Sequence, residues 1–496
     1  MTSGYDLGKK MRTGALWIYF QGGLSSIVQF ATGIILARIL EPSDFGVFYA
    51  VVAFTSLLLL QTQFGIPESL IRAKSVTPAQ WNSAFWFMQC IAIICVMLIV
   101  GVSGWLQGFY DDDRFTLIIW LMSVTILLAP ISTIFGTWLR RDMDYKSVSR
   151  ITIIIGLISV AVSIACALLG FGPFSMVMAG IVSGTVSAIM FARKVPWHPS
   201  LPVNTDGLGS ILSYSWRLHL NSSLHLSSTK VDNMLVGSLV GISHLGIYNR
   251  ALSSAQMPVS EIIGRLYQLL FSGLSRIQDD LEHTIRMYTK LLCAMSAAVF
   301  PFLLVFVFTA EGFINVLYGE KWLAAALPLK ILAIGSMPSV IAITMGSLAD
   351  AQNLVSKETP IQVFNLLFTV VAVWIGSSWG LIGIAVGIAL KSTLLMILMQ
   401  LMLSRSHMKL SWNILVNGLF PAAVASAVAS LFAYAAQNLL SPDFEATSFL
   451  FLCIMTAVIF ISFGATILTL SKLLPNHTAL IANVAMFREL VSKLFK

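Results

Sequence analysis

Five polar side chains recur at helical spacing along one otherwise apolar stretch of the chain. On an α-helix, at 100° per residue, they project within an arc of about 80°; they are Arg217, Asn221, His225, Ser228 and Asp232. A guanidinium group binds phosphate oxygens in pairs, and a carboxylate can hold a cation or an arginine. An imidazole can carry a proton, although a histidine on a helix face can equally be a packed side chain. The stripe therefore predicts an anion site with groups beside it that can exchange charge.

A second polar stripe lies in the next apolar stretch. It spans about 60° and consists of Arg250, Ser254, Glu261, Arg265, Gln268 and Ser272. Because the two helices run in opposite directions, Asp232 should lie level with Arg250, and Arg217 level with Arg265. We predict that the first pair forms a structural or gating ion pair and that the second pair binds phosphate. Two simpler interpretations remain open: Glu261 and Arg265 neutralise each other at i, i+4, or Arg217 extends to lipid headgroups.

The first stripe has a milder, uncharged counterpart 200 residues earlier. Gln21 and Ser25 correspond to Asn221 and His225, and Gln29 projects within the same stripe. Lipid gives a helix no reason to align its few polar groups, so both faces should point toward protein or water.

The turn that follows each of these helices is repeated as well. Residues 36–50 read LARILEPSDFGVFYA, and residues 236–250 read VGSLVGISHLGIYNR. Gly46 and Gly246 occupy the same place in the two copies, where a glycine permits tight entry into the returning helix. The chain therefore carries an internal duplication with an offset of 200 residues.

The composition indicates a membrane protein. Of 496 residues, 57% are hydrophobic and only 10% are charged, and the mean hydropathy is +0.86; soluble domains are about 25% charged. A helix needs about 20 apolar residues to cross a bilayer. Fourteen segments meet this requirement: 14–37, 45–65, 81–106, 116–138, 148–169, 174–192, 212–238, 246–271, 288–310, 323–349, 359–379, 381–403, 413–437 and 447–471. We therefore predict an all-α polytopic membrane protein with about 14 transmembrane helices.

The duplication divides these helices into two lobes of six and a final pair. We predict an N-lobe over residues 1–192, a cytoplasmic linker over 193–211 and a C-lobe over 212–404. Residues 405–496 hold helices 13 and 14 and a cytoplasmic tail. The offset spans six helices, an even number, so both copies should cross the membrane in the same orientation. Such parallel repeats are related by a pseudo-two-fold axis along the membrane normal.

The charge distribution follows membrane topology. Most of the 30 basic residues fall in alternate loops that share a side with the N-terminus, whereas acidic clusters such as Asp111 to Asp113 fall on the other side. By the positive-inside rule both termini are cytoplasmic. The net charge of +8 then reflects topology and anionic headgroups, so we expect no nucleic-acid partner.

Signatures of catalysis and of metal or nucleotide binding are missing from the sequence. It contains no HExxH, GxxxxGK[ST] or GxSxG motif. All five cysteines fall inside apolar segments without metal-type spacing, which argues against disulfides and zinc sites. We therefore expect a transporter and not an enzyme, with no catalytic residue, metal or cofactor.

Charged side chains within the bilayer indicate a polar cavity between the lobes, because each costs about 2.5–3.5 kcal/mol at the centre of a membrane helix. The residues predicted to bind substrate there are Arg217, Asn221, His225, Arg265, Gln21, Ser25, Gln29 and Lys391. The residues predicted to couple ions or to gate are Asp232, Glu261 and Arg250. Lys330 is a further cavity candidate.

These features together resemble a known family. The N-terminal KKMRTGALWIYFQGGLSSIVQF, the turn LARILEPSDFGVFYA and the second-lobe VDNMLVGSLVGISHLGIYNRA resemble the polysaccharide-transport branch of the multidrug/oligosaccharidyl-lipid/polysaccharide exporter superfamily. The chain looks most like Wzx-type flippases and colanic-acid-exporter-like proteins. The resemblance covers essentially the whole chain, although its motifs are turns and helix faces and include no catalytic signature.

The resemblance implies a V-shaped transporter of the bacterial inner membrane. Such a protein moves an undecaprenyl-pyrophosphate-linked oligosaccharide between leaflets by alternating access, and an ion gradient can drive it. Arg217 and Arg265 match the cationic cavity of the family in type and location. The first two helices lack comparable charges, so a symmetric clamp is not expected. The implied partners are membrane lipids and the polymerase and glycosyltransferases of the same pathway, with the chain itself a monomer.

Two other functions are compatible with parts of the pattern. A cation-coupled multidrug antiporter of the same superfamily would favour acidic and aromatic cavity residues, whereas the stripes contain three arginines and two acids. A membrane polymerase or ligase would need a sizeable outer loop, and the predicted loops are short.

Overall fold

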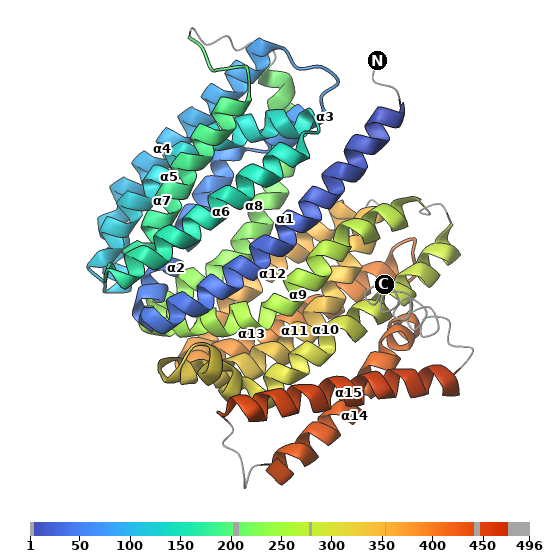
Figure 1. Cartoon of the computed structure of the whole chain (residues 1–496). Helices are drawn as coiled ribbons and strands as arrows, with labels where there is room; N and C mark the ends of the chain where they lie inside the picture. Colours follow the sequence, from blue (N-terminus) through green and yellow to red (C-terminus); the bar gives the residue numbers. More distant parts are fainter. Residues whose placement is uncertain (1–3, 202–207, 277–279, 353, 441–446, 475–496) are drawn as a thin grey trace. The chain divides into compact units, whose positions relative to one another are not determined.

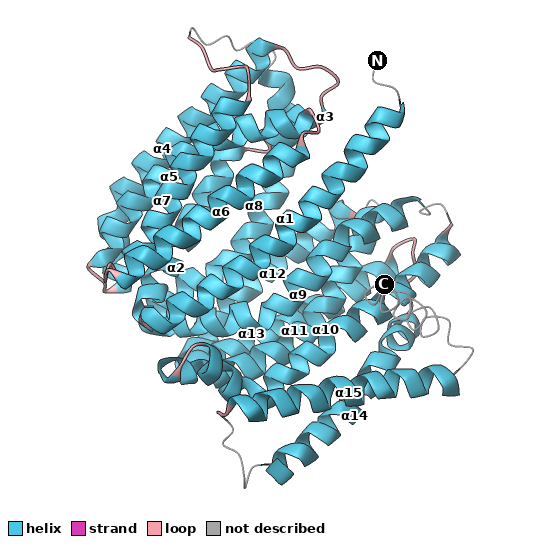
Figure 2. Cartoon of the chain, in the orientation of Figure 1, coloured by secondary structure: helices cyan, strands magenta, loops and turns pink. Residues whose placement is uncertain are grey.

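The computed structural model describes residues 4–201, 208–276, 280–352, 354–440 and 447–474. Within these ranges the chain forms α-helices and two short 3-10 helices, with no strand (Figure 2). By contacts it divides into two compact units, residues 1–246 and residues 247–496, called unit 1 and unit 2 below.

The helices are labelled in chain order in Figure 1. Unit 1 contains α1 (Gly4–Ile39), α2 (Pro42–Gln63), α3 (Ile66–Arg72), α4 (Pro78–Tyr110), α5 (Arg114–Arg141), α6 (Tyr145–Leu168), α7 (Phe174–Lys194), α8 (Leu208–Leu239) and the first turn of α9 (Ile242–Arg276). Unit 2 contains the rest of α9, α10 (Leu281–Leu317), η1 (Glu320–Ala325), α11 (Ala326–Ala351), α12 (Val355–Gly376), η2 (Ser377–Trp379), α13 (Gly380–Arg405), α14 (Trp412–Leu440) and α15 (Phe449–Leu473).

Each of the fourteen predicted apolar segments corresponds to one long helix, which confirms the all-α polytopic class. By length and composition, eleven stretches of the described chain can cross a membrane. One of them, Lys357–Arg405, joins α12 and α13 across η2. The helices α8 and α9 are long enough but do not appear among the eleven. Their polar stripes lower the mean hydropathy, which is the same feature that drew attention to them in the sequence.

The short helix α3 is an element that the sequence did not predict. The chain leaves α2 through two consecutive left-handed residues, Phe64 with φ 46° and Gly65 with φ 68°, and Pro67 then starts a new helix. Left-handed backbone is costly for phenylalanine. The next residue, Gly65, lies against α8, where an added Cβ would meet the Ser215 carbonyl oxygen at 2.7 Å.

The helix α8 packs within unit 1, against α2, α3 and α4. The duplication assigns α8 to the C-lobe, so the repeat in the sequence and the compact units in the structure differ by this helix. The two divisions describe different properties, common descent in one case and contacts in the other. The lobe boundaries remain a prediction.

The repeated turn proves to be a place where two backbones touch. An added Cβ on Gly46 would lie 1.8 Å from the Ile242 carbonyl oxygen, and one on Gly246 would lie 1.9 Å from the Pro42 carbonyl oxygen. Each glycine therefore allows its helix to lie directly against the start of the other copy. The expected part of these glycines in the entry into the returning helix stays a prediction, and the structure adds this reciprocal crossing.

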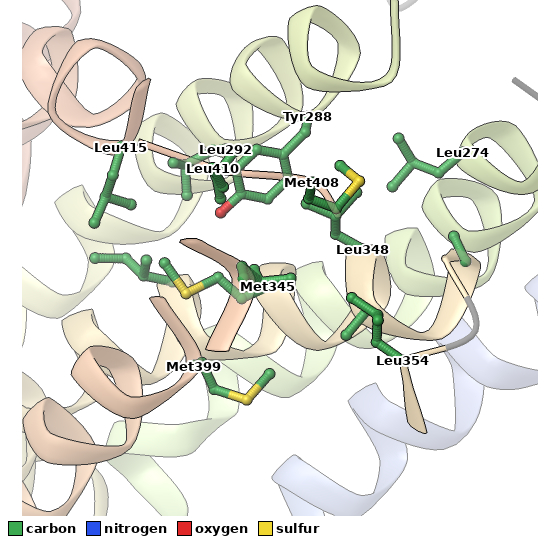
Figure 3. Close-up of a cluster of buried hydrophobic side chains, with 14 residues drawn as sticks. Leu274, Tyr288, Leu292, Met345, Leu348, Leu354, Met399, Met408, Leu410 and Leu415 are labelled. Carbon is green, nitrogen blue, oxygen red and sulfur yellow. The ribbon is translucent and has the colours of Figure 1, made fainter. Parts of the chain in front are cut away.

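Unit 2 is held by close helix packing and by an apolar core. Gly383 and Gly387, spaced i, i+4 on α13, face Gly376 and Ala372 of α12 so closely that an added Cβ on Gly387 would meet the Ala372 carbonyl oxygen at 2.9 Å. Small residues at this spacing let membrane helices approach without a hydrophobic driving force. The core is shown in Figure 3, where the ring of Tyr288 lies among leucine and methionine side chains from several helices.

Candidate functional site

A cavity of about 470 Å³ lies inside unit 2, between α9, α11 and α13. Its volume falls within the range of small-molecule sites, about 300–1,000 Å³. Among the described residues, five polar side chains line it, all uncharged: Gln256, Ser260, Ser336, Ser339 and Ser392. The rest of the wall is aliphatic side chains, glycine and alanine from the same helices. The cavity therefore combines an apolar body with a few polar groups.

The four cavity serines have already used their hydroxyl hydrogens. Each hydroxyl donates to a carbonyl of its own helix, at distances of 2.8 to 3.3 Å; the acceptors are Met257, Leu332, Gly335 and Ile388. This internal bonding is how serine is satisfied in an apolar helix. A serine hydroxyl has two lone pairs, so what remains available for a ligand is acceptor capacity.

A wall of neutral acceptors selects among ligands by charge. Among the described wall residues an anion such as phosphate would meet lone pairs and no cation, and a cation would meet no carboxylate. A molecule with many hydroxyl donors and some apolar surface, such as a sugar ring, satisfies both the serines and the aliphatic wall. Gln256 can donate as well as accept, and it is exposed to the cavity.

The described residues of the polar stripe predicted on α9, which are Arg250, Ser254 and Glu261, do not line this cavity. At 100° per residue, the cavity-lining residues of α9 are centred about 150° from the stripe. The stripe residues Arg250 and Ser254 are instead buried inside unit 2. The Arg250 guanidinium carbon lies 4.7 Å from the ring centroid of Tyr318 and 5.3 Å from that of Trp322. Ser254 Oγ lies 3.2 Å from the Tyr318 hydroxyl.

Arg250 thus joins α9 to the corner between α10 and η1. Trp322 is fully buried, and Gly319 holds the corner in a left-handed conformation with φ 99°. A desolvated cation over an aromatic face contributes about 2 kcal/mol. Aligned polar groups on a membrane helix were expected to face either protein or water, and this part of the stripe faces protein.

Replacing Arg250 by alanine is expected to lower the melting temperature of the purified protein, since both ring contacts are lost. Arg250→Lys keeps the charge but not the flat guanidinium, so we expect an intermediate value. Arg286→Ala is the control, because the ion pair of Arg286 with Glu282 (3.0 Å) is exposed and such pairs contribute about 0–1 kcal/mol. Thermal unfolding in detergent measures all three variants. Equal melting temperatures for Arg250→Ala and Arg286→Ala would contradict the structural role.

The other two predicted gating residues lie on α8 and α9. Asp232 on α8 is buried, and its Oδ1 accepts a hydrogen bond from the Asn233 backbone N–H at 2.8 Å. Asp232 belongs to unit 1 and Arg250 to unit 2, so their ion pair stays a prediction. Glu261 on α9 is half-buried and adjoins the cavity residue Ser260, but it is not part of the wall.

Three predicted substrate residues, Arg217, Asn221 and Arg265, have side chains outside the described part of the structure. Their backbones lie in α8 and α9 as expected. The phosphate seat assigned to the two arginines therefore stays a prediction.

The residues of the predicted uncharged stripe lie in the middle of α1. Gln21 Nε2 donates to Ser25 Oγ at 3.4 Å, and both side chains are half-buried, whereas Gln29 is exposed. His225 on α8 is also exposed. Their shared role in substrate binding stays a prediction.

Neither of the two lysine candidates, Lys330 and Lys391, is a wall residue of the cavity of unit 2. Lys391 on α13 is half-buried and precedes the wall residue Ser392, but it does not line the cavity. Lys330 Nζ lies 2.9 Å from Glu311 Oε1, which joins α11 to α10. The lysine charge of Lys330 is therefore balanced locally.

Sequence reasoning missed two groups of residues. The cavity serines lie on three helices, and Ser336 and Ser339 are spaced i, i+3 in an apolar segment, a weak signal beside the charged stripes. The second group is Gln61 on α2 and His219 on α8, which form a partly buried contact with 2.7 Å between His219 Nε2 and Gln61 Oε1. His219 projects about 200° from Arg217 and so fell outside the stripe.

The sequence matches the family described as polysaccharide biosynthesis protein over residues 35–327. Several known proteins have similar sequences. An uncharacterised membrane protein in the cps region of Klebsiella pneumoniae is 25% identical, over 73% of this chain and 75% of that protein. The teichuronic acid biosynthesis protein TuaB of Bacillus subtilis is 24% identical, over 70% of this chain and 72% of that protein. The lipopolysaccharide biosynthesis protein WzxC of Escherichia coli is 22% identical, over 78% and 79% respectively.

Solved structures show the same fold at low identity. The lipid II flippase MurJ in an inward closed conformation aligns with a TM-score of 0.74 at 12% identity, over 93% of this chain and 100% of that one. An inward-facing multidrug resistance MATE family transporter aligns with a TM-score of 0.58 at 16% identity, over 75% and 92%. The family match spans more than half of the chain. The chain thus belongs to the polysaccharide biosynthesis protein family, in the polysaccharide-transport branch of the exporter superfamily that its repeated turns resemble.

Proposed function

We propose that the chain is a flippase that carries undecaprenyl-pyrophosphate-linked oligosaccharide repeat units from the inner to the outer leaflet of the bacterial inner membrane. The observation that carries this proposal is the cavity of unit 2, whose neutral acceptors and aliphatic wall suit a sugar. Family membership and relatives named for teichuronic acid and lipopolysaccharide biosynthesis support it. Both termini would lie in the cytoplasm.

The three parts of such a substrate need three different environments. The glycan has hydroxyl donors, which match the serine acceptors of the cavity. The pyrophosphate needs cations, and Arg217 and Arg265 are the proposed seat because a guanidinium binds phosphate oxygens in pairs. The polyprenyl tail is as apolar as the bilayer and can remain in lipid. Alternating access then moves the polar head while the tail follows outside the protein.

The lining of the cavity also bears on the alternative of a cation antiporter. A cationic drug is usually held by a carboxylate or by aromatic faces, and the described wall contains neither. Neutral serines give a cation only weak dipoles in place of its water. The glycan is therefore the better match for this wall.

A deletion strain tests the proposal. Without the chain, lipid-linked repeat units should accumulate in the inner leaflet and surface polysaccharide should disappear, and wild-type protein should restore both. Export restored by Arg217→Ala should be about tenfold or more below that restored by the wild-type protein, because a charge-assisted hydrogen bond contributes about 1.5–3 kcal/mol. The leaflet that holds the lipid-linked glycan is determined from the accessibility of the glycan to an external periodate or lectin probe.

Two outcomes would reject the proposal. One is normal delivery of lipid-linked glycan to the outer leaflet in the deletion strain. The other is resistance to cationic dyes that depends on the chain while polysaccharide stays unchanged, which would favour the antiporter. Full export by Arg217→Ala and Arg265→Ala, both inserted at normal abundance, would reject the arginine seat alone.

A further inference from the structure

A buried histidine at the contact between α2 and α8 has no part in the function proposed above. His219 is 8% exposed. Its Nε2 lies 2.7 Å from Gln61 Oε1 and 3.3 Å from Ser223 Oγ. Its ring stacks on Phe64 with centroids 4.6 Å apart and planes at 26°. Side chains of two helices and of the break after α2 thus fix the imidazole in one orientation.

The other ring nitrogen, Nδ1, is buried and has no hydrogen-bond partner among the described residues. The amide oxygen of Gln61 can only accept, so Nε2 carries the hydrogen between them. The orientation of that amide agrees with its nitrogen, which donates to Ser223 Oγ at 3.5 Å. In this arrangement Nδ1 holds an unused lone pair inside the protein, and this lone pair can accept a proton.

Charged and titratable groups on the elements around His219 lie elsewhere. On α2 the nearest, Tyr49, is about 18 Å away along the helix axis, and Asp44 is farther. The exposed groups on the other elements are Glu68 and Arg72 on α3 and Cys90 on α4. Also on α4, Cys95 is buried, and the Tyr110 hydroxyl donates to the Met234 carbonyl. The helix α8 itself carries His225, Lys230 and Asp232, and the side chains of Tyr214 and Arg217 are outside the described structure. His219 makes no ion pair with a described residue.

We propose that His219 is a proton-binding site that couples this transporter to protons, an inference that rests on the flippase function proposed above. In the described conformation a proton on Nδ1 would create a buried N–H and a positive charge without an acceptor, which is costly. The neutral ring therefore favours the packed contact of α2 with α8. The protonated ring favours a conformation in which water reaches Nδ1. A proton shifts such an equilibrium through its unequal affinity for the two conformations.

The backbone beside the ring provides a place for this change. Phe64, which stacks on His219, and Gly65 are the two left-handed residues that separate α2 from α3. Next to them, Ser69 Oγ and Ser215 Oγ are 2.6 Å apart, and Ser215 Oγ also donates to the Gly65 carbonyl at 3.1 Å. Loss of the histidine stack would therefore act directly on the residues where the chain bends.

The test is a histidine and isoleucine NMR titration of the full chain in lipid nanodiscs between pH 5 and pH 8. We expect Nδ1 of His219 to be the unprotonated ring nitrogen at pH 8 and to take up a proton reversibly as the pH falls. Ile66 and Ile211 belong to the buried cluster against which Phe64 packs. Their methyl groups should move to a second set of NMR signals, with the same pH midpoint as the titration of His219. The measurement uses protons as the only ligand and involves no glycan.

Three variants decide between outcomes. His244→Gln, on an exposed histidine at the start of α9, should leave the isoleucine response unchanged, whereas His219→Gln should abolish it. Gln61→Glu places a carboxylate against the ring and should raise the midpoint by about one pH unit or more, which also tests the proposal if His219→Gln does not fold.

An isoleucine response that persists in His219→Gln would overturn the proposal, as would a His219 ring that does not titrate between pH 5 and pH 8. A midpoint that Gln61→Glu leaves unchanged would overturn it as well. Normal titration together with a failed export test would instead reject the flippase function alone, because the titration does not depend on export.

Discussion

Gly46→Ala is expected to prevent the chain from accumulating as a folded protein. The new methyl group would lie 1.8 Å from the carbonyl oxygen of Ile242, which is backbone and cannot rotate away as a side chain can. Forced overpacking of this kind costs about 3 kcal/mol or more, a large part of the stability of a typical domain. Gly246→Ala should behave alike, since its methyl would lie 1.9 Å from the Pro42 oxygen. The yield of monodisperse protein after detergent extraction measures both.

Glycines in open positions provide the matched controls. Gly22 on α1 and Gly156 on α6 have no neighbouring atom within 4 Å of an added Cβ. Alanine is a better helix former than glycine by about 1 kcal/mol, so Gly22→Ala and Gly156→Ala should be neutral or slightly stabilising. Equal yields for all four variants would show that the α2 and α9 backbones do not touch as described.

The helical framework was predictable because the bilayer imposes a length on every crossing segment. The sequence did not predict the break after α2. The apolar pattern continues there, whereas the backbone is left-handed at Phe64 and Gly65. Hydrophobicity does not encode that break, because it depends on the close approach of Gly65 to α8. The packing of α8 in unit 1 was also out of reach, since a duplication shows where a helix came from and not which helices it contacts.

The candidate site was less predictable than the fold, for a related reason. Alignment of polar groups indicates that a helix face avoids lipid, but it does not say whether protein or cavity lies opposite. For Arg250 the answer is two aromatic rings, Tyr318 and Trp322, about 70 residues further along the chain. The cavity serines are silent in the sequence because each can be satisfied by its own helix, and only the meeting of three helices makes them a wall.

Ser339→Phe is expected to reduce export at least tenfold while the protein accumulates normally. Ser339 is a half-buried wall residue of the cavity, so a phenyl ring there takes up space inside the roughly 470 Å³ without disturbing a packed core. Ser339→Ala removes one acceptor and keeps the space. One hydrogen bond contributes about 0.5–1.5 kcal/mol, so this variant should export about two- to tenfold less. Surface polysaccharide per cell, normalised to protein abundance, measures both.

The order of these effects separates a binding cavity from a packing defect. Ile334→Phe makes the same kind of enlargement on α11, but on a side chain that is 54% exposed and outside the wall, so export should stay at the wild-type level. If the cavity receives the glycan, loss should increase from Ile334→Phe through Ser339→Ala to Ser339→Phe, with equal melting temperatures. Wild-type export by a stable Ser339→Phe protein would place the path of the sugar elsewhere, because a wall that tolerates a phenyl ring does not enclose the substrate.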